Sequence, residues 1–238
     1  MTVTYLKKSI RTPASGQTDV RASVEAMLAE LAGGGDAAAT RFARELDNWQ
    51  GDIVVSPEAR TRAATQVPEK LKADIRFAHR NVARFAEAQR GTISDCEVEI
   101  LPGLVAGQRH IPVLSAGCYV PGGRYSHIAS AIMTITTAKV AGVPHIAACS
   151  PPRPGVGIPP PILYAMDLCG ADVILNLGGV QGVAAMANGL FGLPKADILV
   201  GPGNQYVAEA KRILYGQVGI DMFAGPTDSM VIADHGAD

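Results

Sequence analysis

Apolar residues recur at helical spacing through the first ninety residues of the chain, and they predict a helical N-terminal region. In residues 18–49, two apolar stripes stand on either side of three consecutive glycines, residues 33–35, which predicts two helices with a break between them. Pro57 is placed to begin a short third helix and Pro68 a longer one, because proline fits the first turn of a helix. The face expected to be buried on the longer helix consists of Leu71, Ile75, Ala78, Val82, Phe85 and Ala86.

The pattern changes to near-alternation in residues 97–113, around Pro102 and Gly103, and this favours a β-hairpin. Beyond the hairpin, short apolar runs alternate with helical stretches. Strands are expected at residues 113–120, 145–149, 172–175, 198–200 and 230–233, and helices at residues 128–141, 162–169, 180–190 and 205–215. Such alternation predicts right-handed crossover connections and therefore a parallel, Rossmann-like sheet.

The expected fold class is α/β, with the elements divided between two domains. Residues 1–112, the helical region plus the hairpin, are expected to begin a first α/β domain that they do not complete. Residues 113–228 are expected to form the Rossmann-like domain, and residues 229–238 a strand that returns to the first domain.

Composition narrows the classes of function. The 238 residues are 47% hydrophobic but only 5% aromatic, which suits a packed α/β protein, and the formal net charge of -1 arises without any basic block. This argues against nucleic acid or an anionic membrane as a partner and favours a small molecule. The apolar runs are too short to span a bilayer, and the start MTVTYLKKSIRT lacks a secretory apolar region, so a cytoplasmic location is expected.

Cysteine chemistry is not indicated. The four cysteines form no C-x-x-C pair, so neither a disulfide framework nor a thiolate zinc site is expected, and the histidines lack the helical spacing of a metal site. The cysteines are interpreted as buried thiols.

Four glycine-containing turns follow predicted strands, at residues 119–124, 178–182, 201–204 and 225–228. Glycine permits close backbone approach, and a helix that begins after such a turn offers free N–H groups to an anion, so a dinucleotide would fit this rim. None of the turns matches the G-x-G-x-x-G fingerprint, and each could equally be an ordinary turn.

Polar side chains at these turns are the candidate ligand contacts. Gln181 and Asn204 could hydrogen-bond a ribose or a nicotinamide amide, or act only as helix caps. Arg124 and His127 could clamp a carboxylate, phosphate or sulfonate, or be surface residues. Asp221 stands in an apolar strand, where burial requires a partner, so its role could be structural or catalytic.

Several of these stretches together resemble the histidinol dehydrogenase family. They are YVPGGR at residues 119–124, AKVAGV at 138–143, GGVQGVAA at 178–185, GPGNQYVAEAKR at 201–212 and QVGIDMFAGPTD at 217–228. The resemblance implies a homodimeric enzyme with Rossmann-like domains, NAD and zinc, and two hydride transfers that convert a primary alcohol through an aldehyde to a carboxylate. It implies NAD contacts at Tyr119, Gln181 and Asn204, and a substrate contact at Thr227.

Two departures from the family pattern bear on the substrate and on the extent of the site. The chain has Thr227 and Asp228 where the family typically has Ser and Glu, and residues 124–128 differ as well. In these features it looks closer to the branch that oxidises 2,3-dihydroxypropane-1-sulfonate (sulfopropanediol) to sulfolactate, whose anionic head would suit Arg124 and His127. The alternative substrate is L-histidinol, oxidised to L-histidine in histidine biosynthesis.

The family's zinc ligands and catalytic pair lie beyond the point that matches Asp238, so no catalytic or metal-ligating residue is expected in this chain. The 238 residues would then be inactive alone, either as a fragment of a longer enzyme or as a dinucleotide-binding remnant.

Overall fold

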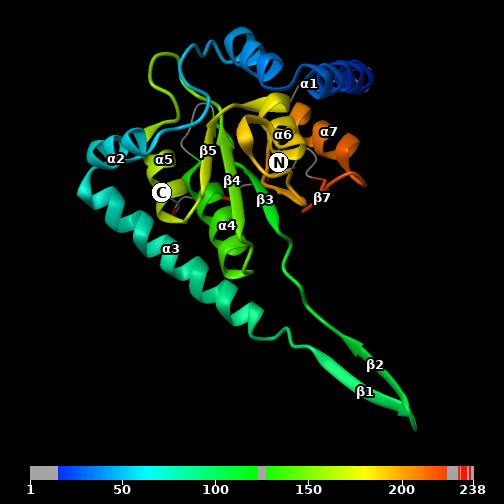
Figure 1. Ribbon diagram of the computed structural model, residues 1–238. Coiled ribbons are helices and arrows are strands. Elements are labelled where there is room, and N and C mark those ends of the chain that lie inside the picture. The colour runs from blue at the N-terminus through cyan, green and yellow to red at the C-terminus, as the bar shows by residue number, and fades with distance from the viewer. Residues whose placement is uncertain (1–15, 123–126, 224–229, 231, 235, 237–238) are drawn as a thin grey trace, which may run out of the picture.

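The computed structural model describes residues 16–122, 127–223, 230, 232–234 and 236. At its centre lies a parallel five-stranded sheet in the order β5-β4-β3-β6-β7 (Figure 1). Its strands are β3 (Ser115–Tyr119), β4 (His145–Ser150), β5 (Val173–Asn176), β6 (Ile198–Val200) and β7 (Gly219–Ile220). The first of these strands in the chain lies in the middle, which is the strand order of doubly wound nucleotide-binding folds. The predicted α/β class and parallel sheet are confirmed.

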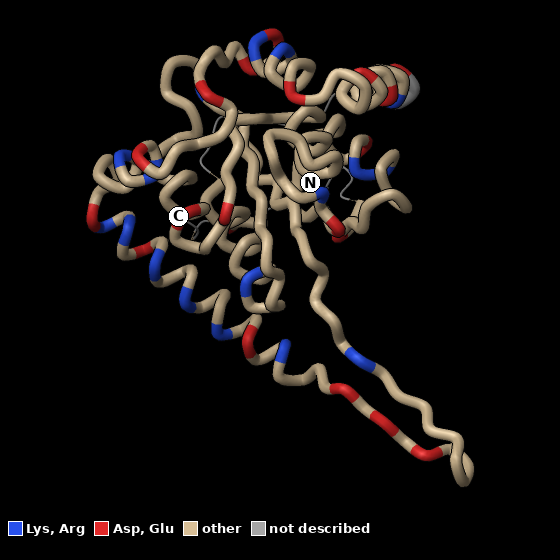
Figure 2. The backbone as a smooth tube through the Cα atoms, viewed as in Figure 1, with Lys and Arg blue, Asp and Glu red and all other residues tan. Residues whose placement is uncertain are grey.

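Helices connect these strands and cover both faces of the sheet. The connecting helices are α4 (Ile128–Val140), α5 (Pro160–Leu168), α6 (Gly179–Asn188) and α7 (Gln205–Leu214), with a short 3-10 turn at Leu190–Gly192. None of the five parallel strands carries Lys, Arg, Asp or Glu, and the charges lie on the helices and loops around them (Figure 2). Because helices bury both faces of the sheet, its strands are continuous apolar runs in the sequence and do not alternate between apolar and polar residues.

The N-terminal helices pack directly on this α/β core. The first helix, α1 (Gly16–Leu46), kinks at Gly35, where φ is 53° and ψ is -139°, and packs against α6 and α7. The kink confirms the two predicted helices with a break at the glycines. On the opposite face, α2 (Pro57–Gln66) packs on α5, and α3 (Glu69–Arg90) packs on α4. The apolar core is thus two clusters, one on each side of the sheet. The assignment of residues 1–112 to another α/β domain stays a prediction.

A short segment between α1 and α2 runs along the outer edge of β5. The Val55 N–H donates to the Ile174 carbonyl at 2.9 Å, and the Asn176 N–H donates to the Ile53 carbonyl at 2.8 Å. The segment is antiparallel to β5, whereas the strands of the sheet are parallel. The hydrophobic pattern did not predict this pairing, because the segment is only three residues long.

The predicted hairpin is confirmed as β1 (Cys96–Leu101) and β2 (Leu104–Gln108), an antiparallel ribbon that projects away from the sheet (Figure 1). Every residue of both strands is exposed. The turn places Gly103 at a φ of 81° and lies next to an irregularity in register between Glu99 and Leu101.

Two sequence expectations about burial are wrong. Phe85 is 67% exposed, because α3 faces α4 through Ile75 and Ala86, and Phe85 points well to the side of that stripe. The described residues of the buried strand expected at 230–233 are exposed instead: Met230 and Ile232 are 83% and 89% exposed, and the described residues there have no strand pairing. Apolar residues alone do not make a strand without a sheet edge to pair with.

None of the helices in the described ranges has the length and apolar character needed to cross a membrane.

Candidate functional site

The candidate site lies at the carboxyl ends of the strands, around the point where β3 and β6 are neighbours in the sheet. From β3 the chain crosses to β4 and then β5 on one side, and it later returns to β6 and β7 on the other. Ligands of open α/β folds bind at the carboxyl ends of the strands where this reversal occurs. Tyr119, Gln181 and Asn204, the three predicted cofactor residues, all lie in or directly after the turns at this end of the sheet.

Tyr119 is the last residue of β3 and joins two of these turns. Its phenolic oxygen accepts a hydrogen bond from the Gly179 N–H at 3.1 Å. Burial raises the pKa of the phenol further above its usual range, so the hydroxyl stays protonated and its hydrogen is available to a ligand. On the other side, the Tyr119 backbone lies against Gly201, where a Cβ would come within 2.1 Å of the Tyr119 carbonyl oxygen. Only glycine fits there, and its φ of 114° requires glycine as well.

Gln181 lies in the first turn of α6 and is buried. Its Nε2 donates to Asp47 Oδ2 at 2.9 Å, while its Oε1 has no hydrogen-bond partner among the described residues. The same Asp47 oxygen accepts from the Gly178 N–H at 3.1 Å. Burial raises the Asp47 pKa, and the hydrogen bonds from Gly178 and Gln181 act in the opposite direction. Asp47 therefore belongs to the site.

Sequence reasoning missed Asp47. It follows the end of α1 and lies 134 residues before Gln181, and no local motif marks it. The one local signal is the helix end itself: Asn48 has a φ of 49°, which turns the chain just after Asp47.

Asn204 is the N-cap of α7. Its Oδ1 accepts from the backbone N–H groups of Tyr206 at 3.0 Å and Val207 at 3.1 Å, so the capping role considered for it is confirmed. The cap uses only the oxygen of the amide. Nδ2 has no partner in the part of the chain that the structure describes and can donate to a ligand.

An ion pair between a buried lysine and a partly exposed aspartate holds the turn before Asn204. Lys211, whose side chain is 4% exposed, pairs with Asp221 Oδ1 and also donates from Nζ to the Gly201 carbonyl at 3.0 Å. Asp221 Oδ2 accepts from the Gly201 N–H at 2.8 Å. Both backbone groups of Gly201 are therefore fixed by this pair. Of the two roles left open for Asp221, its contacts are those of the structural role.

Of the predicted substrate-binding residues, the structure describes only His127. His127 is exposed and stands immediately before α4, without a side-chain cap contact. Arg124, Thr227 and Asp228 lie outside the described residues.

The described residues do not form a metal site. Within the described ranges, no group of three or more His, Cys, Asp or Glu side chains could hold a metal ion. Zinc therefore does not fit the residues of this chain that the structure describes.

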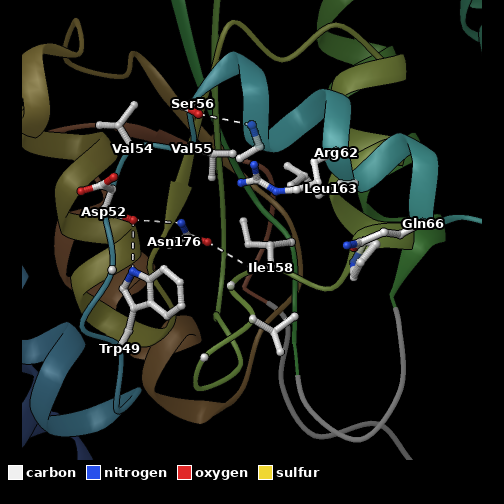
Figure 3. A pocket seen from close by; sticks show the side chains of 17 residues that line it. Trp49, Asp52, Val54, Val55, Ser56, Arg62, Gln66, Ile158, Leu163 and Asn176 are labelled. Carbon is white, nitrogen blue, oxygen red and sulfur yellow. Dashed lines mark hydrogen bonds between the residues drawn. The ribbon is translucent and has the colours of Figure 1, made fainter.

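A cavity of about 550 Å³ lies elsewhere, at the outer edge of β5 (Figure 3). The Asn176 side chain donates from Nδ2 to the Asp52 carbonyl at 3.0 Å and accepts from the Ile158 N–H at 3.1 Å. The Trp49 indole N–H donates to the same Asp52 carbonyl at 3.1 Å. Tyr119, Gln181 and Asn204 are not among the residues that line this cavity, so it is separate from the site that they form.

The polar atoms of these three residues are of the kinds that a dinucleotide can hydrogen-bond. Tyr119 O–H and Asn204 Nδ2 are donors, and Gln181 Oε1 is an unpaired acceptor. The N-termini of α6 and α7 lie beside them and favour negative charge. Such a set can orient a ligand that carries hydroxyl, amide and phosphate groups.

Comparison with known proteins agrees with this geometry. The model of the family described as histidinol dehydrogenase matches residues 10–238. The chain is 64% identical to a sulfopropanediol 3-dehydrogenase of Ruegeria pomeroyi and 62% identical to a histidinol dehydrogenase homolog of the same organism. Each match covers all of this chain and 55% of the relative, so the chain spans about half the length of the curated relatives it matches.

A solved structure gives the same result for the fold. The crystal structure of histidinol dehydrogenase from Elizabethkingia anophelis superposes with a TM-score of 0.81 at 30% sequence identity. The match covers 92% of this chain and 53% of that one. Three findings agree with one another: the sheet is parallel and in doubly wound order, the predicted cofactor residues lie at the carboxyl ends of its strands, and the family match covers nearly the whole chain. The chain belongs to the histidinol dehydrogenase family.

Proposed function

We propose that the whole protein is an NAD-dependent dehydrogenase that oxidises a small polar primary alcohol to a carboxylate in two hydride transfers, and that this chain supplies its cofactor-binding side. The observation that carries the proposal is that Tyr119, Gln181 and Asn204 lie at the carboxyl ends of β3, β5 and β6, with hydrogen-bonding atoms that have no partner among the described residues. Its family membership and its relatives support the same class of reaction.

NAD, when bound, accepts the hydride, and the residues of this chain have the task of holding it. The Tyr119 hydroxyl and the Asn204 amide would donate hydrogen bonds to it, and the start of α7 would favour its negative charge. The Lys211–Asp221 pair keeps the turn before Asn204 in one conformation. Preorganised donors of this kind reduce the ordering cost of binding.

The favoured substrate is sulfopropanediol, which would be oxidised to sulfolactate. The 64% identity to a sulfopropanediol 3-dehydrogenase supports this choice, and Arg124, His127 and Thr227 remain the proposed substrate contacts. L-histidinol is the alternative, because the chain is also 40% identical to a histidinol dehydrogenase of Parasynechococcus marenigrum. The zinc requirement, the homodimer and the cytoplasmic location remain part of the proposal on the family resemblance alone.

An activity assay on the protein expressed from its complete reading frame tests the substrate. NADH formation is followed with sulfopropanediol and with L-histidinol, each with added zinc and after chelation. The proposal expects turnover of sulfopropanediol with two NADH formed per alcohol. Activity on L-histidinol with none on sulfopropanediol would make L-histidinol the assigned substrate. Inactivity on every small alcohol tested would refute the proposal that the protein is an alcohol dehydrogenase.

A pair of variants tests the cofactor side. Asn204→Ser keeps a neutral cap for α7 but removes the amide donor, so we expect weaker NADH binding with little change in thermal stability. Asn204→Ala removes cap and donor together and should lower both affinity and stability. If Asn204→Ser binds NADH as well as the wild type does, Asn204 is only a cap.

A further inference from the structure

Asp47 connects the end of α1 to the turn at which α6 begins. One of its carboxylate oxygens, Oδ2, accepts two hydrogen bonds, from the Gly178 N–H at 3.1 Å and from Gln181 Nε2 at 2.9 Å. The first contact holds the backbone of the turn after β5. The second holds the side chain of a residue proposed to bind the cofactor. The same residue thus determines both the backbone and the side-chain geometry at this place.

The chemistry of the carboxylate decides which end of the Gln181 amide is left over. An ionised carboxylate can only accept hydrogen bonds, so Gln181 must direct its NH2 group toward Asp47. Its carbonyl oxygen is left buried and without a partner among the described residues. A neutral residue at position 47 would permit either end of the amide to face it. An unpaired buried acceptor is unfavourable, and a ligand that supplies a donor gains from meeting it.

Among the described residues, the other titratable groups that act electrostatically on Asp47 are neutral. They are Tyr119 on β3 and Cys149 on β4, and burial raises the pKa of each above its usual range. In the described part of the chain, Asp47 has no ion pair with Lys, Arg or His. Its contacts are therefore directed to the two donors of the α6 turn, and no salt bridge competes with them.

We propose that Asp47 is a positioning residue for the cofactor, which holds the Gln181 carboxamide so that its carbonyl oxygen receives a hydrogen bond from a donor on the dinucleotide. The donor is a ribose hydroxyl or the carboxamide N–H. The inference rests on the proposed function, since it requires that the site bind a dinucleotide. The carbonyl is shielded in the ligand-free molecule, so binding includes a small movement of the Gln181 side chain or of the turn beside it.

Cofactor affinity tests the proposal directly. The dissociation constant of NADH is measured by its fluorescence on the full-length protein for the wild type, Asp47→Asn, Asp47→Ala and Gln181→Met. We expect binding to weaken about threefold in Asp47→Asn, whose amide oxygen still accepts, and about tenfold in Asp47→Ala and Gln181→Met. Thermal melts of the same samples identify any loss that comes from unfolding.

The pH profile separates positioning from a merely structural role. As the pH falls through the raised pKa of Asp47, wild-type affinity should decline to that of Asp47→Asn, and the Asn variant should show no such step. Tyr119 and Cys149 stay neutral over this range and do not contribute. Because the pH comparison uses only the wild type and the isosteric variant, it decides the question even if Asp47→Ala fails to fold.

A cofactor analogue identifies the donor. The acetylpyridine analogue of NAD lacks the carboxamide N–H but keeps every ribose hydroxyl. If Gln181→Met weakens binding of NAD and not of the analogue, the donor is the carboxamide, and equal weakening assigns it to the ribose.

Wild-type affinity in Asp47→Ala, or an identical pH profile in wild type and Asp47→Asn, overturns the inference and leaves the proposed function intact. A wild type that does not bind NADH at all overturns both.

Discussion

At the scale of single residues, the ion pair of Lys211 and Asp221 joins a buried charge to a partly exposed one. The Lys211 side chain is 4% exposed and that of Asp221 31% exposed, so the two partners differ in their access to water. A buried charge without a partner is costly, whereas a half-exposed one is solvated. The two residues are therefore not equivalent, although they form one ion pair.

This asymmetry predicts unequal effects of removing either partner. Asp221→Ala leaves the Lys211 ammonium buried and unpaired, and should lower the free energy of unfolding by roughly 3 kcal/mol. Lys211→Met leaves a carboxylate that water reaches, and should cost about 1 to 2 kcal/mol. Urea unfolding of both variants and of the double variant measures the difference. Equal losses would contradict the proposed asymmetry.

The cysteines provide a second prediction at this scale. Cys118, Cys149 and Cys169 are buried, and burial raises the pKa of Cys118 to about 12 and that of Cys169 to about 11. The thiolate is the reactive form, so these thiols should be inert in the folded protein. Cys96, exposed on β1, should be alkylated first. Peptide mass spectrometry after a short iodoacetamide pulse checks this, with a urea-unfolded sample and Cys96→Ser as controls.

At the scale of elements, the kink in α1 depends on a single backbone conformation. Gly35 has a φ of 53°, which side chains other than glycine rarely adopt, whereas Gly33 has no such φ and belongs to the preceding helical stretch. A Cβ at either position would meet nothing within 4 Å. The two glycines therefore differ in conformation and not in available space.

Alanine substitutions at these glycines should have opposite effects. Gly35→Ala forces a left-handed conformation on a residue with a Cβ and should cost about 1 to 2 kcal/mol. Gly33→Ala reduces the freedom of the unfolded chain and should stabilise by roughly 0.5 to 1 kcal/mol. Thermal melts of the two variants beside the wild type measure both signs. Destabilisation by Gly33→Ala would show that this stretch is not a regular helix.

The elements also show what the sequence could predict. The strands from β3 to β6 and their helices were placed within a few residues, because buried parallel strands and amphipathic helices leave clear periodic patterns. Gln181 and Asn204 could be found as candidates because glycine turns mark the strand ends, whereas Tyr119 was named as a candidate only through the family resemblance. Asp47 and Lys211 could not, since their importance depends on packing between distant segments. Apolar character also misled at Phe85 and at residues 230–233, where burial depends on a neighbour and not on the residue itself.

At the scale of the whole molecule, the described residues divide into a packed body and a ribbon that extends from it (Figure 1). Strands β1 and β2 pair with each other, and their apolar side chains Val98, Ile100 and Leu104 are all more than half exposed. An isolated two-stranded ribbon is only marginally stable in water. The ribbon should therefore open more readily than the body.

Hydrogen exchange tests this division in the 238-residue chain. Amides of β1 and β2 should exchange far sooner than those of β3 and β4, which lie at the centre of the sheet. The control is a variant in which a short glycine linker replaces residues 96–108, and it should retain the slow exchange of the central strands. Ribbon amides as protected as those of β3 would mean that another part of the protein covers the ribbon.

The antiparallel segment beside β5 has a consequence for how this sheet can grow. An unpaired strand edge is a template on which another chain can polymerise, and residues 53–55 occupy that template on one side. That segment becomes the new edge on its side, with only three residues, and β7 offers only two residues on the other side. A short edge is a weak template for strand addition by a partner or during aggregation. In the described part of the chain, intermolecular extension of the sheet is therefore limited at both ends.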